Sequence, residues 1–251
     1  MVSEKSRIYF DGKHYDAWTE REIDIPFYKK QVKKYGEPVL ELGCGTGRIT
    51  IPIARDGHKI IGLDLSEKLL KRAKEKSKKD DLNIDWIIGD MRDFSLDKRF
   101  NLIFIPFNTI HHILTLEDME KVLENVKEHL EPNGRFMVEL FNPDLDILNR
   151  DPKEEHEVLE YKNPDGDEEI KVTETTDYEK AKQLMHLTWF YELDDEMVER
   201  EWTIRVWFPK EVNAILKYNG FKIEKKYGDF DESTFTNNSG QQIIVCEKRQ
   251  R

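Results

Sequence analysis

The sequence predicts an α/β fold in which helices cover both faces of a mostly parallel sheet. Three observations predict it. Between residues 39 and 141, short apolar runs alternate with stretches of helical period, as in a doubly wound sheet. A glycine-rich segment joins the first apolar run to the helix that follows it. After residue 142 the apolar residues recur with a period of two, which indicates antiparallel strands.

Composition limits the classes of function. The chain has 251 residues, which allows one large domain or one domain with an insertion. Its net charge is -11, whereas a bulk nucleic-acid binder normally has a basic surface. The two cysteines, Cys44 and Cys246, suggest neither a disulfide framework nor a metal site. No apolar run approaches the ~18 residues of a membrane span. We therefore expect a cytoplasmic protein that binds no membrane.

The first half of the chain supplies the alternating elements in order. We expect a helix capped by Asp24, with a proline in its first turn and Gly36 as its end. Another helix is expected to begin after Ser66, which would cap it, and to end at about Ser77. The remaining expected elements are a strand at 39–42, a helix at 48–55, strands at 59–63, 84–88 and 100–106, a helix at 116–130 and a strand at 135–141.

The second half has a different organisation. Residues 170–207 predict three longer antiparallel strands, since the even positions from Val198 to Val206 are mostly apolar. A helix at 209–218 and two closing strands at 221–227 and 241–247 follow. Residues 151–201 hold 18 acidic and 6 basic residues, so nearly all the net negative charge lies there.

The segment from Gly43 to Gly47 is the main candidate for a ligand-binding loop. Glycines allow a positive φ and a close approach of ligand to backbone, and the helix that follows adds free N–H groups. A dinucleotide loop of the form G-x-G-x-x-G would need glycine at position 48, where the chain has Arg48. Asp64 ends the second strand, where a carboxylate can accept both hydroxyls of a ribose. The alternative for Asp64 is a loop or capping role.

A second carboxylate follows the third strand. Asp90 could accept the exocyclic amine of an adenine, and Leu65 and Met91 could flank the ring with apolar surface. The alternative is an ordinary aspartate in a turn.

Residues 39–141 resemble the core of the class I S-adenosylmethionine-dependent methyltransferases. The resemblance rests on Val39–Gly47 as the first motif, on Asp64 and Asp90 as the acidic positions, on Asn101–Phe107 as the fourth-strand motif and on Leu130–Gly134 as a later turn. It implies a Rossmann-like doubly wound, mostly parallel seven-stranded sheet with an antiparallel last strand, plus a small antiparallel β insertion as a cap. It also implies S-adenosylmethionine as cofactor.

The same resemblance implies which residues bind this cofactor. The methionine part would face the glycine loop, the ribose would bind Asp64, and the adenine would lie at Asp90 and Met91. The full set of expected cofactor-binding residues is Tyr15, Glu41, Gly43, Cys44, Gly45, Gly47, Asp64, Leu65, Asp90, Met91, Arg92 and Phe107.

The segment after the fourth strand contains two candidate catalytic residues. His111 or His112 could accept a proton from an amine or hydroxyl of the acceptor. The alternative is a histidine that packs the loop against the next helix. Transfer from a sulfonium requires no metal, and we expect none.

We expect three parts in the chain. Residues 1–36 would form an N-terminal lid and helix, 37–141 with 209–251 the cofactor-binding domain, and 142–208 an inserted cap. The aromatic residues Tyr9, Tyr15 and Trp18 are candidates for the lid, with a plain hydrophobic anchor as the alternative. Residues of the insert that are candidates to line an acceptor site are Trp189, Tyr191, Arg205 and Trp207.

The sequence therefore predicts an enzyme that transfers a methyl group to a small-molecule acceptor. The alternatives are a protein or nucleic-acid methyltransferase and an inactive nucleotide-binding protein of the same fold. An Asn/Asp-Pro-Pro-Tyr motif of base-amine methyltransferases is absent after the fourth strand, where Pro106-Phe107-Asn108 stands. The acidic insert leads to the hypothesis of a neutral or cationic acceptor, an amine above all. The alternative is a solvated acidic face. The oligomeric state has no signal in the sequence.

Overall fold

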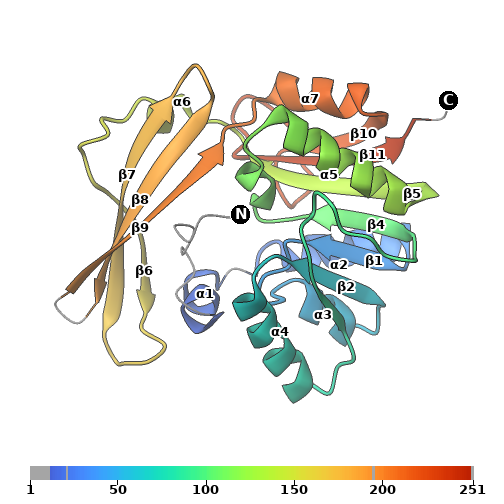
Figure 1. The fold of residues 1–251 in the computed structure, drawn as a ribbon, viewed down its shortest axis with the longest axis horizontal. Helices are drawn as coiled ribbons and strands as arrows, with labels where there is room; N and C mark the ends of the chain where they lie inside the picture. Colours follow the sequence, from blue (N-terminus) through green and yellow to red (C-terminus); the bar gives the residue numbers. More distant parts are fainter. Residues whose placement is uncertain (1–11, 21, 194–195, 250–251) are drawn as a thin grey trace. The chain divides into compact units, whose positions relative to one another are not determined.

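The computed structural model describes residues 12–20, 22–193 and 196–249. The chain divides into two compact units, each with its own sheet (Figure 1). Unit 1 comprises residues up to Glu20 and Pro143–Val206, and unit 2 comprises Arg21–Asn142 and Trp207–Arg251. The expected lid residue Tyr9 lies outside the described residues.

Unit 2 contains a seven-stranded sheet in the order β10-β11-β5-β4-β1-β2-β3. Strand β11 runs antiparallel to both of its neighbours, whereas the pairs from β5 to β3 are parallel. This confirms the predicted Rossmann-like topology. The strands are β1 (Val39–Leu42), β2 (Ile60–Asp64), β3 (Asp85–Ile88), β4 (Phe100–Ile105), β5 (Leu130–Phe141), β10 (Phe221–Tyr227) and β11 (Gln241–Lys248).

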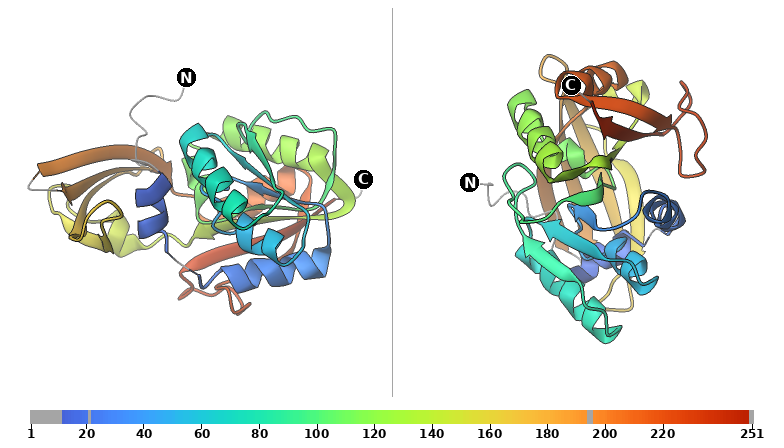
Figure 2. Two further views of the ribbon diagram at one scale, coloured as in Figure 1. Left: turned by 90° about the horizontal axis from the view of Figure 1, so that it is seen from below. Right: turned by 90° about the vertical axis from the view of Figure 1, so that its right-hand side faces the viewer.

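Helices bury apolar residues against both faces of this sheet. On one face, α2 (Ile25–Tyr35) and α3 (Thr50–Arg55) contribute to one core cluster, and on the other α5 (Leu116–His129) and α7 (Pro209–Tyr218) contribute to a second. Figure 2 shows the sheet between α2, in blue, and α5, in green. Helix α4 (Glu67–Lys79) packs against β2, β3 and α3.

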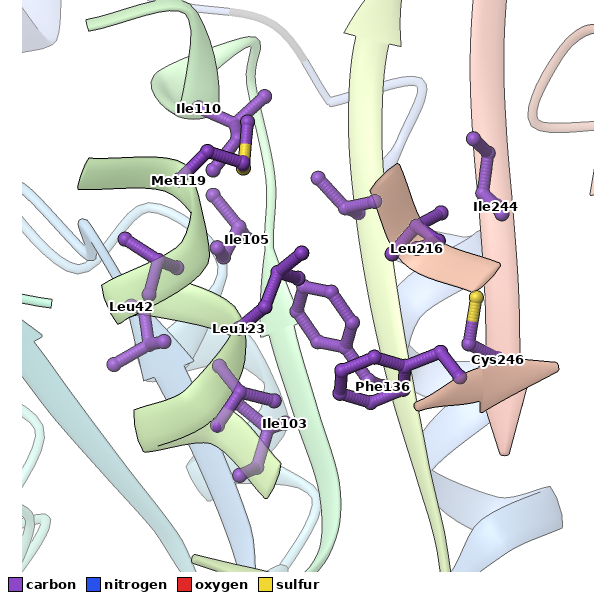
Figure 3. Packing of buried hydrophobic residues seen from close by; sticks show 14 of the residues in the cluster. Leu42, Ile103, Ile105, Ile110, Met119, Leu123, Phe136, Leu216, Ile244 and Cys246 are labelled. Atoms are coloured by element: carbon purple, nitrogen blue, oxygen red, sulfur yellow. The ribbon is translucent and has the colours of Figure 1, made fainter. Parts of the chain in front are cut away.

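The cluster that includes residues of α5 and α7 is the larger core of unit 2. It explains why the parallel strands are almost wholly apolar. Leu42, Ile103 and Ile105 of the central strands meet Met119 and Leu123 of α5 in this cluster (Figure 3). Strands covered on both faces have no wet side, so they lack the alternation of a half-exposed strand.

Unit 1 contains a four-stranded antiparallel sheet in the order β6-β7-β8-β9. Its elements are α1 (Gly12–Trp18), α6 (Leu145–Leu148), β6 (His156–Lys162), β7 (Glu169–Glu179), β8 (Leu184–Leu193) and β9 (Glu196–Arg205). Helix α1 packs against β6, and its Trp18 meets Trp189 of β8 edge to face, with ring centroids 5.5 Å apart.

The two faces of this sheet differ in chemistry. The cross-strand pairs Tyr191–Val198 and Leu187–Trp202 put these side chains on one face, where Tyr191 and Leu187 are buried and Val198 and Trp202 are half-buried. Intervening residues face the other way, and Glu192, Glu199 and Glu201 are exposed there. The predicted alternation of β9 is therefore confirmed.

Three local predictions need correction. Asp24 stands at the N-cap position of α2, but its carboxylate accepts no capping hydrogen bond because it pairs with Arg48. The turn expected at Pro132–Gly134 lies within a single strand, β5, since the chain is extended from Leu130. The insert has β6 in addition to the three expected strands.

Candidate cofactor-binding site

The candidate site lies where the parallel strands β4, β1 and β2 end. In the register of the sheet, Leu42 pairs with Leu63 and Glu41 with Phe104. The three segments that follow these strands therefore emerge side by side: the glycine loop Gly43–Gly47, the turn after Asp64 and the turn after Ile105. Ligands in open α/β sheets bind beyond these carboxyl ends.

All three glycines of the loop have positive φ angles: 74° at Gly43, 55° at Gly45 and 77° at Gly47. Two of them also face other side chains. A Cβ on Gly43 would lie 2.4 Å from Cγ2 of Thr109, and one on Gly47 would lie 2.5 Å from Cη2 of Trp86. The sequence predicted glycine here for the approach of a ligand, but at these two positions close packing within the protein also requires it.

Asp64 is fixed by the loop itself. Its Oδ2 accepts a hydrogen bond from the Gly45 N–H at 2.7 Å, and its Oδ1 accepts one from the Ser66 N–H at 2.7 Å. Each carboxylate oxygen has a second lone pair, so two hydroxyls could still bind. Burial raises the pKa of Asp64, and the backbone N–H donors act against that shift.

Two expected cofactor-binding residues direct their side chains into the protein beneath the loop. Glu41 is buried at the end of β1 and accepts a hydrogen bond from the Thr50 hydroxyl. Burial raises the pKa of Glu41 to about 8. Cys44 is also buried, with its sulfur beside Gly62. Any contact with a cofactor at Glu41 and Cys44 would involve backbone atoms.

Asp90 forms an ion pair with another expected cofactor-binding residue. Arg92 donates to both Asp90 oxygens, with Nη2 2.5 Å from Oδ2, and its Nη1 lies 2.9 Å from Asp118 Oδ2. The guanidinium lowers the pKa of Asp90. Leu65 is 51% exposed, and Met91 is half-buried against the larger core. The apolar surface expected beside an adenine is thus present at Leu65.

The turn after β4 has an unusual backbone. Phe107 and Asn108 both have positive φ angles, 54° and 59°. The Phe107 N–H donates to Oε2 of Glu139 at 2.9 Å, and the Arg48 guanidinium lies 4.9 Å from the centroid of the Phe107 ring. Glu139 was not among the residues predicted for this site, although a carboxylate inside the apolar run of β5 is a visible signal.

The two histidines of this segment have different surroundings. His111 is buried, and its ring stacks on Phe141 with centroids 3.8 Å apart and planes 6° apart. His111 therefore has a packing role, but it packs against β5 and not against the next helix as the alternative had it. The side chain of His112 is exposed.

The structure places the remaining candidates in different parts of the chain. Tyr15 belongs to unit 1, where its ring meets Trp18 edge to face. Trp189 and Tyr191 lie on the apolar face of the four-stranded sheet, and Arg205 donates to Gln183 at 3.3 Å. Trp207 belongs to unit 2, where it lies fully buried in the larger core.

The described ranges contain neither a cluster of metal ligands nor a helix that could span a membrane. Among residues 12–20, 22–193 and 196–249, no group of three histidine, cysteine, aspartate or glutamate side chains could hold a metal ion. In the same ranges no helix has the length and apolar character to cross a membrane.

Comparison with known proteins identifies the family of this core. Residues 39–134 match the family model described as a methyltransferase domain. An N,N-dimethyltransferase of dTDP-3-amino-3,4,6-trideoxy-alpha-D-glucopyranose from Streptomyces venezuelae is 32% identical over 51% of each chain. A ubiquinone biosynthesis O-methyltransferase from Coxiella burnetii is 23% identical over 57% of this chain and 64% of that one. The chain thus spans about half the length of such curated relatives.

A solved structure extends the likeness of fold to both units. The CcbJ methyltransferase from Streptomyces caelestis superposes with a TM-score of 0.83 at 22% identity, over 95% of this chain and 96% of that one. At this identity the likeness shows the fold alone. Residues 39–134 thus match a methyltransferase domain, and the chain as a whole has the fold of the CcbJ methyltransferase.

Proposed function

We propose that the protein transfers a methyl group from S-adenosylmethionine to a small-molecule acceptor. The observation that carries this proposal is the pairing of Asp64 with the Gly45 N–H at the carboxyl end of β2. This hydrogen bond holds beside the glycine loop the carboxylate that we expect to bind the ribose. A dinucleotide loop would need glycine at position 48, but the Arg48 side chain lies between Asp24 and Phe107.

The expected roles of the residues follow from their places. Asp64 accepts the ribose hydroxyls, Leu65 covers the adenine, and Asp90 accepts the adenine amine while Arg92 holds its carboxylate in position. The methionine part lies along Gly43–Gly47. The methyl carbon is already activated by the sulfonium, so the protein's task is to align the acceptor for in-line attack and to exclude water.

A proton must leave an amine or hydroxyl acceptor during transfer. Of the two candidate bases, His112 is the better one, because His111 is stacked on Phe141 and buried. A His112→Ala variant tests this role by its rate of turnover.

We further propose that the acceptor is a neutral or cationic amine. Support comes from the relative whose name describes N,N-dimethylation of an amino sugar. The acidic charge of the insert gives weaker support, because Glu199 and Glu201 are exposed on the sheet face opposite Trp189. Exposed acidic side chains of this kind are typical of a solvated surface.

A screen of small amines, hydroxy compounds and thiols tests the function. Conversion of S-adenosylmethionine to S-adenosylhomocysteine that depends on an added amine is the expected result. If steering by the insert matters, the kcat/KM of a cationic acceptor falls as salt rises. Turnover only with anionic acceptors, or only with protein or nucleic acid, would contradict the proposal.

A further inference from the structure

Glu139 is a fully buried carboxylate to which the proposed function gives no role. It lies on β5, near the end of the strand, and is 0% exposed. Its Oε2 accepts two hydrogen bonds, from the Tyr28 hydroxyl at 2.7 Å and from the Phe107 N–H at 2.9 Å. A buried charge is costly unless such donors compensate it. Glu139 therefore connects α2 to the turn after β4.

The turn needs this partner because its backbone is strained. Consecutive positive φ angles at Phe107 and Asn108 are unfavourable for residues with a side chain, and such residues persist only where their surroundings fix them. The carboxylate of Glu139 binds the N–H of the first strained residue. Burial and the neighbouring Glu139 raise the pKa of Tyr28 well above its usual value, so the phenol keeps the proton that it donates.

The turn in its strained form contacts both ends of the glycine loop. At one end, Thr109 packs so closely on Gly43 that a Cβ there would lie 2.4 Å from its methyl group. At the other end, Arg48 lies over the Phe107 ring, and its guanidinium nitrogens donate to both oxygens of buried Asp24 at 2.6 and 2.7 Å.

We propose that Glu139 is a positioning residue for cofactor binding: through the Phe107 N–H it holds the turn after β4 against the glycine loop. This inference rests on the proposed function, because the loop must be the place where the methionine part of S-adenosylmethionine binds. Glu139 itself touches no cofactor. Its effect is to keep Gly43 and Arg48 in the binding conformation before the cofactor arrives.

Two substitutions of Glu139 distinguish loss of the hydrogen-bond acceptor from loss of the carboxylate alone. Glu139→Leu removes the acceptor while keeping a side chain of similar size, whereas Glu139→Gln keeps a carbonyl oxygen that can accept from both donors. Calorimetry with S-adenosylmethionine and S-adenosylhomocysteine, well below the melting temperature, gives their Kd values. We expect Glu139→Leu to raise both Kd values about tenfold or more, since the Phe107 N–H and the Tyr28 hydroxyl lose their acceptor. Glu139→Gln should stay within about threefold of wild type.

A matched control removes a similar acceptor at another site. The Nε2 of buried His129 accepts a hydrogen bond from the Leu96 N–H at 3.0 Å. His129→Leu should lower the melting temperature and leave both Kd values unchanged. A purely structural role for Glu139 would give this same result in Glu139→Leu.

The outcomes are distinct. Unchanged Kd values in folded Glu139→Leu, or a Glu139→Gln variant as weak as Glu139→Leu, would overturn the positioning role alone. If Glu139→Leu does not fold, Tyr28→Phe serves instead. It removes one donor to Oε2, and a Kd raised about threefold supports the proposal while an unchanged Kd overturns it. Wild-type protein that binds neither compound would overturn the proposed function itself, and the inference with it.

Discussion

The indole of Trp86 occupies the space that a side chain at position 47 would need. Its Cη2 lies 2.5 Å from the ideal Cβ position of Gly47, and its Nε1 donates to the Ser77 hydroxyl at 3.1 Å. The ring lies also against Gly62, where a Cβ would be 2.6 Å from Cζ3. Trp86 thus packs against both the glycine loop and the adjacent strand β2. This packing requires glycine at position 47.

Gly47→Ala should therefore reduce the free energy of unfolding by about 2–4 kcal/mol, through backbone strain and the clash with Trp86. Urea denaturation measures this. Gly57→Ala is the matched control, because Gly57 also has a positive φ, 89°, but has nothing within 4 Å of a Cβ. Equal losses in the two variants would show that Trp86 does not constrain the loop.

Stability should depend on pH through Glu41. Burial raises its pKa to about 8 in the folded state from 4.5, so between these values the folded protein holds a proton that the unfolded chain releases. This contribution to stability is complete below pH 4.5 and is lost as pH rises through 8. Glu41→Gln cannot ionise, so it should gain stability relative to wild type by up to about 1.4 kcal/mol per pH unit across that window.

Denaturation at pH 5.5, 6.5 and 7.5 measures the difference between Glu41→Gln and wild type. Glu37→Gln is a control of opposite sign, because a hydrogen bond from His58 lowers the pKa of Glu37. Its stabilising contribution is present above pH 4.5 and is lost as pH falls. Parallel pH curves for wild type and Glu41→Gln would contradict the assignment of a raised pKa to Glu41.

Asp64→Ala should weaken the binding of S-adenosylhomocysteine by about 1.5–3 kcal/mol, because hydrogen bonds to a charged group are lost. The Gly45 N–H also loses its acceptor, so the loop is less ordered. Calorimetry measures the affinity. The control Asp56→Ala removes a carboxylate that pairs with Lys29 beyond the end of α3. An Asp64→Ala variant with wild-type affinity would exclude Asp64 from the ribose role.

The strands of the sheet could be predicted from the sequence. The side-chain contacts that only the tertiary structure creates could not. Strands such as Phe100–Ile105 are apolar because both faces are covered, and this is visible in a short window of sequence. Strand β6 was missed because its mostly exposed residues have no clean alternation. The carboxylate of Glu139 within an apolar run marks a special position, but its role and that of Trp86 depend on partners far along the chain. Asp24 has the residue type of a helix cap, but Arg48, 24 residues away, binds it instead.

We expect the glycine loop and Asp64 to bind S-adenosylmethionine and not a dinucleotide. Thermal unfolding with each compound tests it most directly. At 100 times its Kd, S-adenosylmethionine or S-adenosylhomocysteine should add about 2.7 kcal/mol to the free energy of unfolding and raise the melting temperature, while NAD leaves it unchanged. A rise with NAD, and none with S-adenosylmethionine or S-adenosylhomocysteine, would contradict the claim.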